Sequence, residues 1–500
     1  MRIWRWLRWI LVGVVALALL AVGLGWWAMR RSLPPIDGMA SAPGLATKAT
    51  IERDAAGRPV ITASSRADLA YALGFAHAQD RFFQMDLSRR FAAGELSEVF
   101  GAVAVGHDTK VRRFGFGPAA HAVVEASSPD ERAVIDAYAR GVNAGLAGLA
   151  SRPWEYLLLR AEPRAWTAED SVLVVYSMWW QLQYGSLTAE IDRRRLERAA
   201  ARVEGATPAD AHALIAFLYA GYSEWDTPNY GSEICAANCA HAAPMYPRLL
   251  SFPGLDGVGA GAAGEPKAPG SNNWAVAGAH TKSGVALIAN DMHLDLGVPA
   301  VWYPARLRVT GEPALDVAGV TLPGTPALVA GSNGRIAWGF TNSYGDFTDV
   351  RFGPCADPGY RERRERIKVK GQDDVEVLYH DVGAGFVTGD DEVDNIRNGD
   401  CIQVAWIATH PDATNFGLLG LERASTIDDA LNLAPRIGIP GQNMVVGDAT
   451  GRIAWRYSAV NSCDCGYSFF GAMSSQDSRA HATNPRCRTD AGPDAASRSA

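Results

Sequence analysis

Several features that mark particular classes of protein are missing from this sequence. Basic residues are not in excess: 47 Lys and Arg stand against 54 Asp and Glu in 500 residues, and the net charge of −7 argues against nucleic acid as the main partner. No Gly-x-Ser-x-Gly turn occurs between a strand and a helix, which argues against a Ser-His-Asp hydrolase. Cysteine is scarce, with seven residues, and Cys235 and Cys239 lack a second pair at zinc spacing. Cys355 and Cys401 bracket a segment of the body and are candidates for a disulfide in an oxidising compartment.

Charge is absent from a long stretch near the amino terminus. The run Trp9–Met29 contains no charged residue, and Arg2, Arg5 and Arg8 precede it. It is long enough to span a bilayer as a helix, and tryptophans at both ends suit the interface. We therefore expect an uncleaved transmembrane anchor in the cell membrane, with the body of the protein in the periplasm or otherwise outside the cytoplasm. A cleaved signal peptide is the alternative, although no small-x-small site precedes Arg30.

Aliphatic residues are absent from the other end. From Asn461 to Ala500 the sequence has no Leu, Ile or Val, and it shows no helical or strand period. Such a composition buries too little apolar surface to order the chain, so we expect a disordered tail.

Between these ends, the sequence pattern changes once, from helical periodicity to short strand-like runs. Lys48–Thr62 predicts two strands around a turn, and Ser65–Phe100 and Asp130–Leu149 have helical periodicity. After a spacer rich in Gly, Pro and Ala at 228–270, Trp274–Trp338 breaks into short β runs separated by turns. A helical first half and a strand-rich second half predict an α+β architecture.

The spacer contains a formal dinucleotide fingerprint, with glycines at Gly259, Gly261 and Gly264. No strand precedes it, and Pro266 and Pro269 follow where a helix would have to receive a pyrophosphate. We therefore expect no organic cofactor.

The spacer ends abruptly at Gly270-Ser271, and the patterned segment begins at once. Cleavage between these two residues would give Ser271 a free α-amine beside its hydroxyl. Such an amine titrates near ~8 and serves as a base for a hydroxyl nucleophile. A simple turn is the alternative that the local tripeptide also allows.

Six motifs resemble the penicillin acylase family, whose members are N-terminal-nucleophile hydrolases made as one precursor and cut into α and β chains. The motifs are AHAQDRFFQMD (76–86), AGELSEVFG (93–101), GSNNW (270–274), NDMH (290–293), GSNGRIAWG (331–339) and QN (442–443). The resemblance covers about residues 44–460. It implies an αββα sandwich with a helical α-chain region, and an amidohydrolase that cleaves linear amides R–CO–NH–R′.

The resemblance also implies the catalytic residues. Ser271 would attack Gly270 to release itself and would then attack the substrate. The oxyanion would be held by the side chain of Asn443 and by the backbone N–H groups of His293 and Asn342. A histidine at position 293 favours β-lactam substrates of the cephalosporin type or acyl-homoserine-lactone-like substrates, and it could hold or tune the amine of Ser271.

A calcium ion is implied in the same way. Its ligands would be the carboxylates of Glu190, Asp346 and Asp349 and the carbonyl of Thr348, which are oxygen donors of the kind that calcium takes. The metal would staple the α and β chains of one processed precursor together as a heterodimer.

The arginine that the resemblance implies beyond Asn443 is not recognisable, and the tail from Asn461 begins where the β chain of the family would continue. We expect a truncated or frame-shifted product, and an inactive membrane-anchored remnant that remains an unprocessed precursor is the alternative function. The expected divisions are an anchor at 1–31, an α-chain region at 44–227, a spacer at 228–270, a partial β-chain catalytic region at 271–460 and a non-family tail at 461–500.

Overall fold

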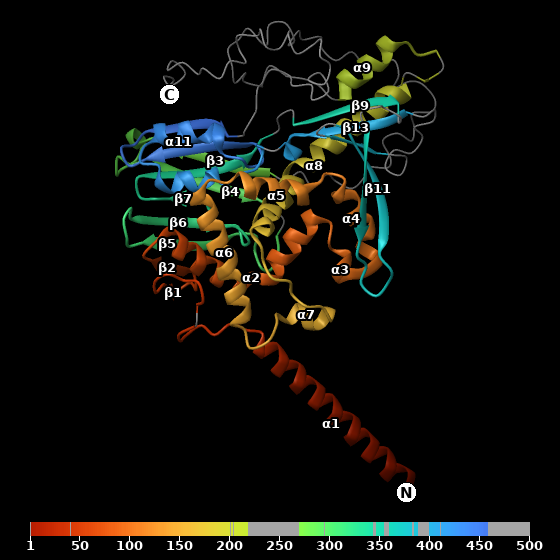
Figure 1. Cartoon of the computed structure of the whole chain (residues 1–500), viewed down its shortest axis with the longest axis vertical. Helices are drawn as coiled ribbons and strands as arrows, with labels where there is room; N and C mark the ends of the chain where they lie inside the picture. The colour runs from red at the N-terminus through yellow and green to blue at the C-terminus, as the bar shows by residue number, and fades with distance from the viewer. Residues whose placement is uncertain are drawn as a thin grey trace.

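A computed structural model shows how these elements are arranged (Figure 1). The residues that it describes are 2–40, 42–200, 202–203, 205–218, 270–294, 296–343, 347–354, 360–382, 385–388, 400–410 and 412–458. The spacer before Gly270, the tail at 461–500 and Cys355 lie outside these residues, as does the side chain of Cys401. The expectations that concern them stay predictions.

The first half of the chain is helical, as the sequence predicts. The helices are α1 (Arg2–Arg31), α2 (Arg66–Ala93), α3 (Ser97–Phe100), α4 (Val105–Arg112), α5 (Phe116–Ala126), α6 (Pro129–Ala147), α7 (Trp154–Leu159), α8 (Ala168–Ala200) and α9 (Pro208–Leu218), with α11 (Ile427–Leu433) later in the chain. Short 3₁₀ turns are η1 (Gly101–Ala104), η4 (Gly278–His280), η5 (Ile407–Thr409), η6 (Gly417–Arg423) and η7 (Ala434–Arg436).

The second half is rich in strands. They are β3 (Gly270–Val276), β4 (Leu287–His293), β5 (Tyr303–Val309), β6 (Leu315–Thr321), β7 (Leu328–Ser332), β8 (Ile336–Asn342), β9 (Thr348–Pro354), β10 (Tyr360–Ile367), β11 (Val375–Val382), β12 (Gly385–Thr388), β13 (Asp400–Trp406), β14 (Gln442–Asp448) and β15 (Ile453–Ser458). The predicted pair near the amino terminus is present as β1 (Thr50–Arg53) and β2 (Pro59–Ala63). The α+β content predicted from the sequence is confirmed.

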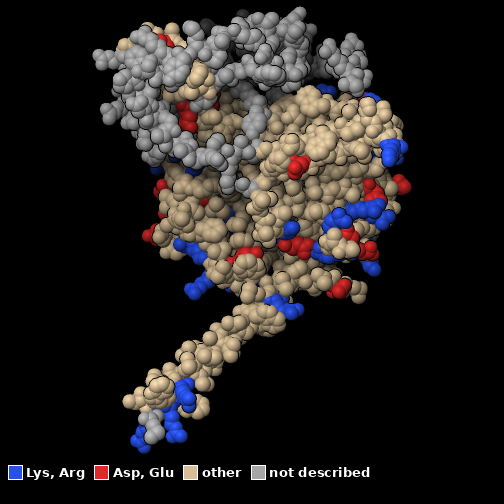
Figure 2. All heavy atoms as spheres, turned by 180° about the vertical axis from the view of Figure 1, so that it is seen from behind, with Lys and Arg blue, Asp and Glu red and all other residues tan. Residues whose placement is uncertain are grey.

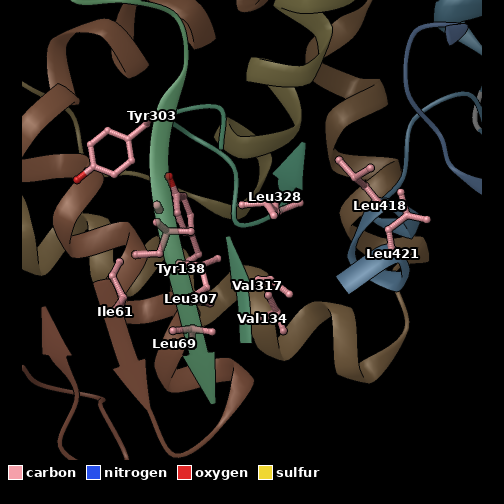
Figure 3. Packing of buried hydrophobic residues seen from close by; sticks show 14 of the residues in the cluster. Ile61, Leu69, Val134, Tyr138, Tyr303, Leu307, Val317, Leu328, Leu418 and Leu421 are labelled. Atoms are coloured by element: carbon pink, nitrogen blue, oxygen red, sulfur yellow. The ribbon is translucent and has the colours of Figure 1, made fainter. Parts of the chain in front are cut away.

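The main sheet has eight strands in the order β1-β2-β5-β6-β7-β8-β14-β15, and only β2 and β5 run parallel. Strand β5 shows why one face is buried: Tyr303 and Leu307 are in the core, whereas Arg306 and Arg308 between them are exposed. Successive side chains of a strand point to opposite faces, so one face of the sheet is apolar. Figure 3 shows Leu307 among the packed residues of this core.

Helices α2 and α6 pack tightly together and contribute to that core. Helix α6 begins with a capping box in which Ser128 and Glu131 satisfy each other's backbone N–H groups, and α2 begins at Ser65, whose hydroxyl accepts from the Asp68 N–H. Helix α11 and η6 supply further apolar side chains to the same core. These helices cover the apolar face of the main sheet.

The hairpin formed by β3 and β4 lies on the other face of the main sheet and contacts β8 and β14. Its outer face is partly open to solvent, since Trp274 is 54% and Leu287 57% exposed. The described residues therefore contain a helical layer, a large sheet and a two-stranded second layer. The αββα sandwich that the resemblance implies stays a prediction.

A second core joins helix α8 to a five-stranded sheet with the order β10-β11-β12-β13-β9. Aromatic rings dominate it: Phe116 stacks on Tyr176, and Trp406 lies edge-on to Phe114. Helix α8 therefore lies between the two sheets, which places its side chains beside the hairpin.

Helix α1 projects from the body with none of its residues buried (Figures 1 and 2). Among the described residues it alone is long and apolar enough to cross a membrane, judged by length and composition. Figure 2 shows charge at its two ends and none between them.

Candidate functional site

Ser271 lies near the start of β3 and is directly opposite Met292 in β4. The two side chains share the inner face of the hairpin, because directly opposed residues of an antiparallel pair point the same way. Asn290 on this inner face hydrogen-bonds to Phe340 in β8, so the face with Ser271 is turned toward the main sheet. Exposed and partly buried residues alternate along β3, and Ser271 is one of the partly buried ones, as expected for a strand with one covered face.

Ser271 lines a cavity of about 110 Å³ between the hairpin, the main sheet and helix α8. Fifteen of the twenty residues around this cavity are apolar. One wall is formed by Val175, Met178 and Leu182, which are spaced to lie along one side of α8. The arrangement brings a hydroxyl to the wall of an apolar cavity, as an enzyme that binds an acyl chain would need.

Asn342 ends β8 and lines the same cavity. Its side-chain Nδ2 donates to the Leu182 carbonyl at 3.2 Å, and its Oδ1 accepts from Gln442 Nε2 at 3.4 Å. Both side-chain groups are thus used to join α8 to the ends of β8 and β14. The Asn342 backbone, which the sequence proposes as an oxyanion donor, is held by these contacts at the cavity wall.

Asn443 is the next residue of β14 after Gln442 and therefore faces the hairpin rather than the helical core. Its Nδ2 donates to the Asn342 carbonyl at 3.4 Å, and its Oδ1 accepts from Trp455 Nε1 at 3.3 Å. The structure thus brings Asn443 and Asn342 together. In this uncut chain the Asn443 amide is bound to a backbone carbonyl.

His293 pairs with Gly270 across the hairpin, and its side chain lies on the outer face, opposite to that of Ser271. Its Nε2 is 2.8 Å from Asp291 Oδ2. An ideal Cβ built on Gly270 would lie 3.3 Å from His293 Nδ1, so the imidazole covers Gly270. The structure places this side chain beside the predicted scissile bond and not next to the Ser271 hydroxyl.

Two of the four expected calcium ligands can be located. Glu190 on α8 and Thr348 on β9 belong to elements that pack together, and Thr348 is buried. Asp346 lies outside the described residues, and so does the side chain of Asp349. The Glu190 carboxylate is 2.6 Å from Arg193 Nη2. A cation that binds Glu190 would have to displace this guanidinium from the carboxylate. Among the described residues no three His, Cys, Asp or Glu side chains cluster as metal ligands do.

The helix α8 wall is the part of the site that sequence reasoning missed. Val175, Met178 and Leu182 follow the i, i+3, i+7 spacing of one helix face, which is a signal visible in the sequence. The same spacing is also typical of a helix face that packs into the core. Only the packing of α8 beside the hairpin shows that these residues line the cavity.

The site can be compared with known proteins. The family model described as penicillin amidase matches residues 48–462. The chain is 32% identical over 441 residues to the penicillin acylase 2 proenzyme of Pseudomonas sp. strain SE83, covering 85% of this chain and 54% of that protein. It is 32% identical over 453 residues to the acyl-homoserine lactone acylase QuiP of Pseudomonas aeruginosa, covering 85% and 51%.

Among solved structures, the thermostable penicillin G acylase from Alcaligenes faecalis in tetragonal form is similar over 37% of this chain and 97% of that chain, with 29% identity and a TM-score of 0.31. The chain spans about half the length of the curated relatives that it matches.

Proposed function

The chain belongs to the penicillin amidase family, and on this premise we propose that it is an amidohydrolase that cleaves linear amide bonds of N-acylated small molecules. The family resemblance inferred from the sequence motifs is confirmed. Two relatives are named as acylases, one of penicillin and one of acyl-homoserine lactones. We propose substrates of these two kinds, a β-lactam or an acyl-homoserine-lactone-like amide, and an αββα N-terminal-nucleophile fold.

The observation that supports this proposal is the position of Ser271 on the wall of an apolar cavity. An acyl chain would lie against the apolar side chains, and burying each of its methylenes would contribute about 0.8 kcal/mol. The amide carbonyl would then lie beside the Ser271 hydroxyl, in a cavity that the polar side chains of Asn342 and Gln442 also line.

The first step in the proposed scheme is self-cleavage. Ser271 Oγ attacks the Gly270 carbonyl carbon, the Gly270–Ser271 C–N bond breaks, and the hydroxyl proton passes to the departing amine. Water hydrolyses the resulting ester, leaving a carboxylate on Gly270 and restoring the hydroxyl of Ser271. The His293 imidazole, which covers Gly270, would assist proton transfer at this bond.

Turnover would repeat the chemistry on the substrate. The α-amine of Ser271 takes the proton as Oγ attacks the amide carbonyl, and the proton leaves with the amine product. Water then hydrolyses the acyl ester to a carboxylic acid. The backbone N–H groups of His293 and Asn342 and the side chain of Asn443 would stabilise the oxyanion, and each such donor contributes about 10²–10³-fold in rate. Asn443 would first have to release the Asn342 carbonyl.

Sequencing the amino termini of the expressed full chain tests this function. A new terminus that reads Ser-Asn-Asn-Trp, absent from Ser271→Ala, is the expected result. Ser283→Ala is the matched control, because Ser283 is an exposed serine between β3 and β4 and its loss leaves cleavage unchanged. An intact chain that never yields the new terminus would contradict the proposal and favour the alternative, an inactive precursor anchored in the membrane.

We also propose that calcium joins α8 to β9 through Glu190, Asp346, Asp349 and the Thr348 carbonyl. Hard oxygen donors suit this ion, which would stabilise the processed heterodimer without entering the reaction. Calcium added to the chelator-treated full chain should raise its unfolding temperature, and Glu190→Gln should abolish most of the rise. Glu197→Gln, which removes a carboxylate from the same helix, is the control; an equal loss in both variants would place the ion elsewhere.

A further inference from the structure

Asn290 joins the hairpin to the main sheet through both ends of its side-chain amide. Its Oδ1 accepts from the Phe340 N–H at 3.1 Å, and its Nδ2 donates to the Phe340 carbonyl at 2.8 Å. The same Nδ2 also donates to the carbonyl of Asn272 in β3 at 3.1 Å. One side chain thus holds β3, β4 and β8 together.

The backbone of β8 needs such a partner at this point. Pairing between β7 and β8 ends at Trp338, two residues before Phe340. Residues two apart in a strand direct their N–H and carbonyl groups to the same side, so Phe340 faces the position of the β7 residue that would pair with it if the two strands had not separated there. The Asn290 amide carries one donor group and one acceptor, as a peptide unit does, and takes that position.

The close approach also explains a glycine in β8. An ideal Cβ on Gly339 would lie 2.8 Å from Asn290 Cβ and 2.9 Å from both Cγ and Oδ1. Contacts this short require atoms to move, so any larger residue at position 339 would displace the Asn290 side chain.

The position of Asn290 along the hairpin gives these bonds a function. The turn end of the hairpin is held to the main sheet by backbone bonds, from Gly278 N to Gly451 O at 2.8 Å and from Ala286 N to Asp448 O at 3.3 Å. Asn290 supplies its bonds toward the other end, two residues from Met292, the strand partner of Ser271.

We propose that Asn290 is a positioning residue that seats the nucleophile strand on β8 and so sets the place of the Ser271 hydroxyl at the cavity. The inference rests on the proposed role of Ser271. Displacement of a reacting group by about 1 Å is enough to cost 10²-fold in rate, so loss of these bonds should slow both self-cleavage and turnover by about that factor.

The hydrogen bonds between Asn290 and Phe340 can be tested without an activity measurement. The test uses full-length Ser271→Ala protein, which is unable to cleave itself. Adding Asn290→Ala should accelerate hydrogen exchange of the Phe340 amide about tenfold. Asn272→Ala is the control, because it removes the same amide group from the exposed outer face of the same hairpin. Equal exchange in both variants would overturn the proposal, whether or not Ser271 proves to be the nucleophile.

A double-mutant cycle tests the link to catalysis in the cleaving protein. Gly339→Ala and Asn290→Ala should each slow self-cleavage about 10²-fold, because each removes the same contact. The double variant should be no more than a few-fold slower than either one, since interacting residues are not additive. Independent effects, which would multiply to about 10⁴-fold, would overturn the proposal.

The Asn290→Asp variant tests the positioning role through the pH dependence of the self-cleavage rate, which a purely structural role would leave unchanged. An ionised carboxylate loses the donor and faces the Phe340 and Asn272 carbonyls, which disfavour the charged form. Protonation restores one donor. The self-cleavage rate relative to the unsubstituted chain should therefore rise as pH falls from 8 to 5, and a flat ratio would overturn the proposal.

Discussion

His77 is fully buried between α2, α6 and the main sheet, where each group of its ring has one partner. Gly324 N–H donates to the Tyr138 hydroxyl, which donates to His77 Nδ1 at 2.7 Å. His77 Nε2–H donates to the Thr321 hydroxyl at 2.9 Å, which donates to the Tyr303 carbonyl. The chain of bonds accommodates a neutral imidazole with no unpaired group, and it explains structurally why a histidine occurs in the motif at residues 76–86.

Burial lowers the pKa of His77 to about 3, with the nearby Arg81 charge acting in the same direction. The unfolded state therefore binds a proton between about pH 6.5 and 3 that the folded state does not, and stability falls as the pH falls through this window. At pH 5 the loss is about 2 kcal/mol.

We expect His77→Gln to remove this acid-dependent loss. The comparison is urea denaturation of the detergent-solubilised Ser271→Ala chain, with and without His77→Gln, at pH 7 and pH 5. Burial acts to raise the pKa of Asp86, but Arg89 and Arg90 outweigh it and hold that pKa below its ordinary value. The stabilisation from Asp86 is therefore present above about pH 3.8 and changes little between pH 7 and pH 5. The same free-energy difference between the two pH values in both chains would refute the assignment.

At the scale of elements, α2 and α6 approach each other through glycines. A Cβ on Gly141 would collide with the backbone carbonyl of Tyr71, and one on Gly74 with that of Tyr138. Helix propensity favours alanine over glycine by about 1 kcal/mol, whereas overpacking a core costs about 1–3 kcal/mol. Where the helices touch, the cost of overpacking therefore exceeds the gain in helix propensity, and replacing glycine by alanine lowers the stability.

We expect Gly141→Ala to destabilise the protein by about 1–3 kcal/mol and Gly185→Ala to stabilise it by up to about 1 kcal/mol. Gly185 is an exposed residue inside α8 with nothing within 4 Å of an added Cβ, so it isolates the propensity term. Urea denaturation of the two variants in the Ser271→Ala chain gives both values. A stabilising shift in both variants would show that propensity alone governs the contact.

Local patterns predicted elements well and the assembled site less well. The turn between β1 and β2 and the periodicity of α2 and α6 are short-range signals, and those elements lie where the sequence places them. The face on which His293 lies depends on its pairing with Gly270, and this register is set by a turn and by packing against β8. The cavity wall on α8 likewise depends on elements about a hundred residues apart.

At the scale of the whole molecule, the body contributes little to holding α1. None of the side chains of α1 is buried, and Arg31 at its end donates to the Ala150 carbonyl of the body. We propose that α1 is an uncleaved anchor and that the body lies outside the cytoplasm.

The full chain should therefore stay in the membrane pellet after alkaline carbonate extraction, whereas a chain lacking residues 2–29 should be released with an unchanged unfolding temperature. The signal-peptide alternative predicts a soluble protein whose amino terminus lies just beyond α1. Amino-terminal sequencing of the extracted material distinguishes the two outcomes.

Because Gly270 pairs with His293, the predicted cut lies between the first two residues of β3 rather than in a loop. After the cut, the new carboxylate of Gly270 would remain paired in that strand, directly beside the hydroxyl that released it. A product held on the same molecule competes at a millimolar effective concentration. Freshly cleaved protein would then show a lag: activity would rise only as the severed strand end peels away, and the delay would be independent of protein concentration.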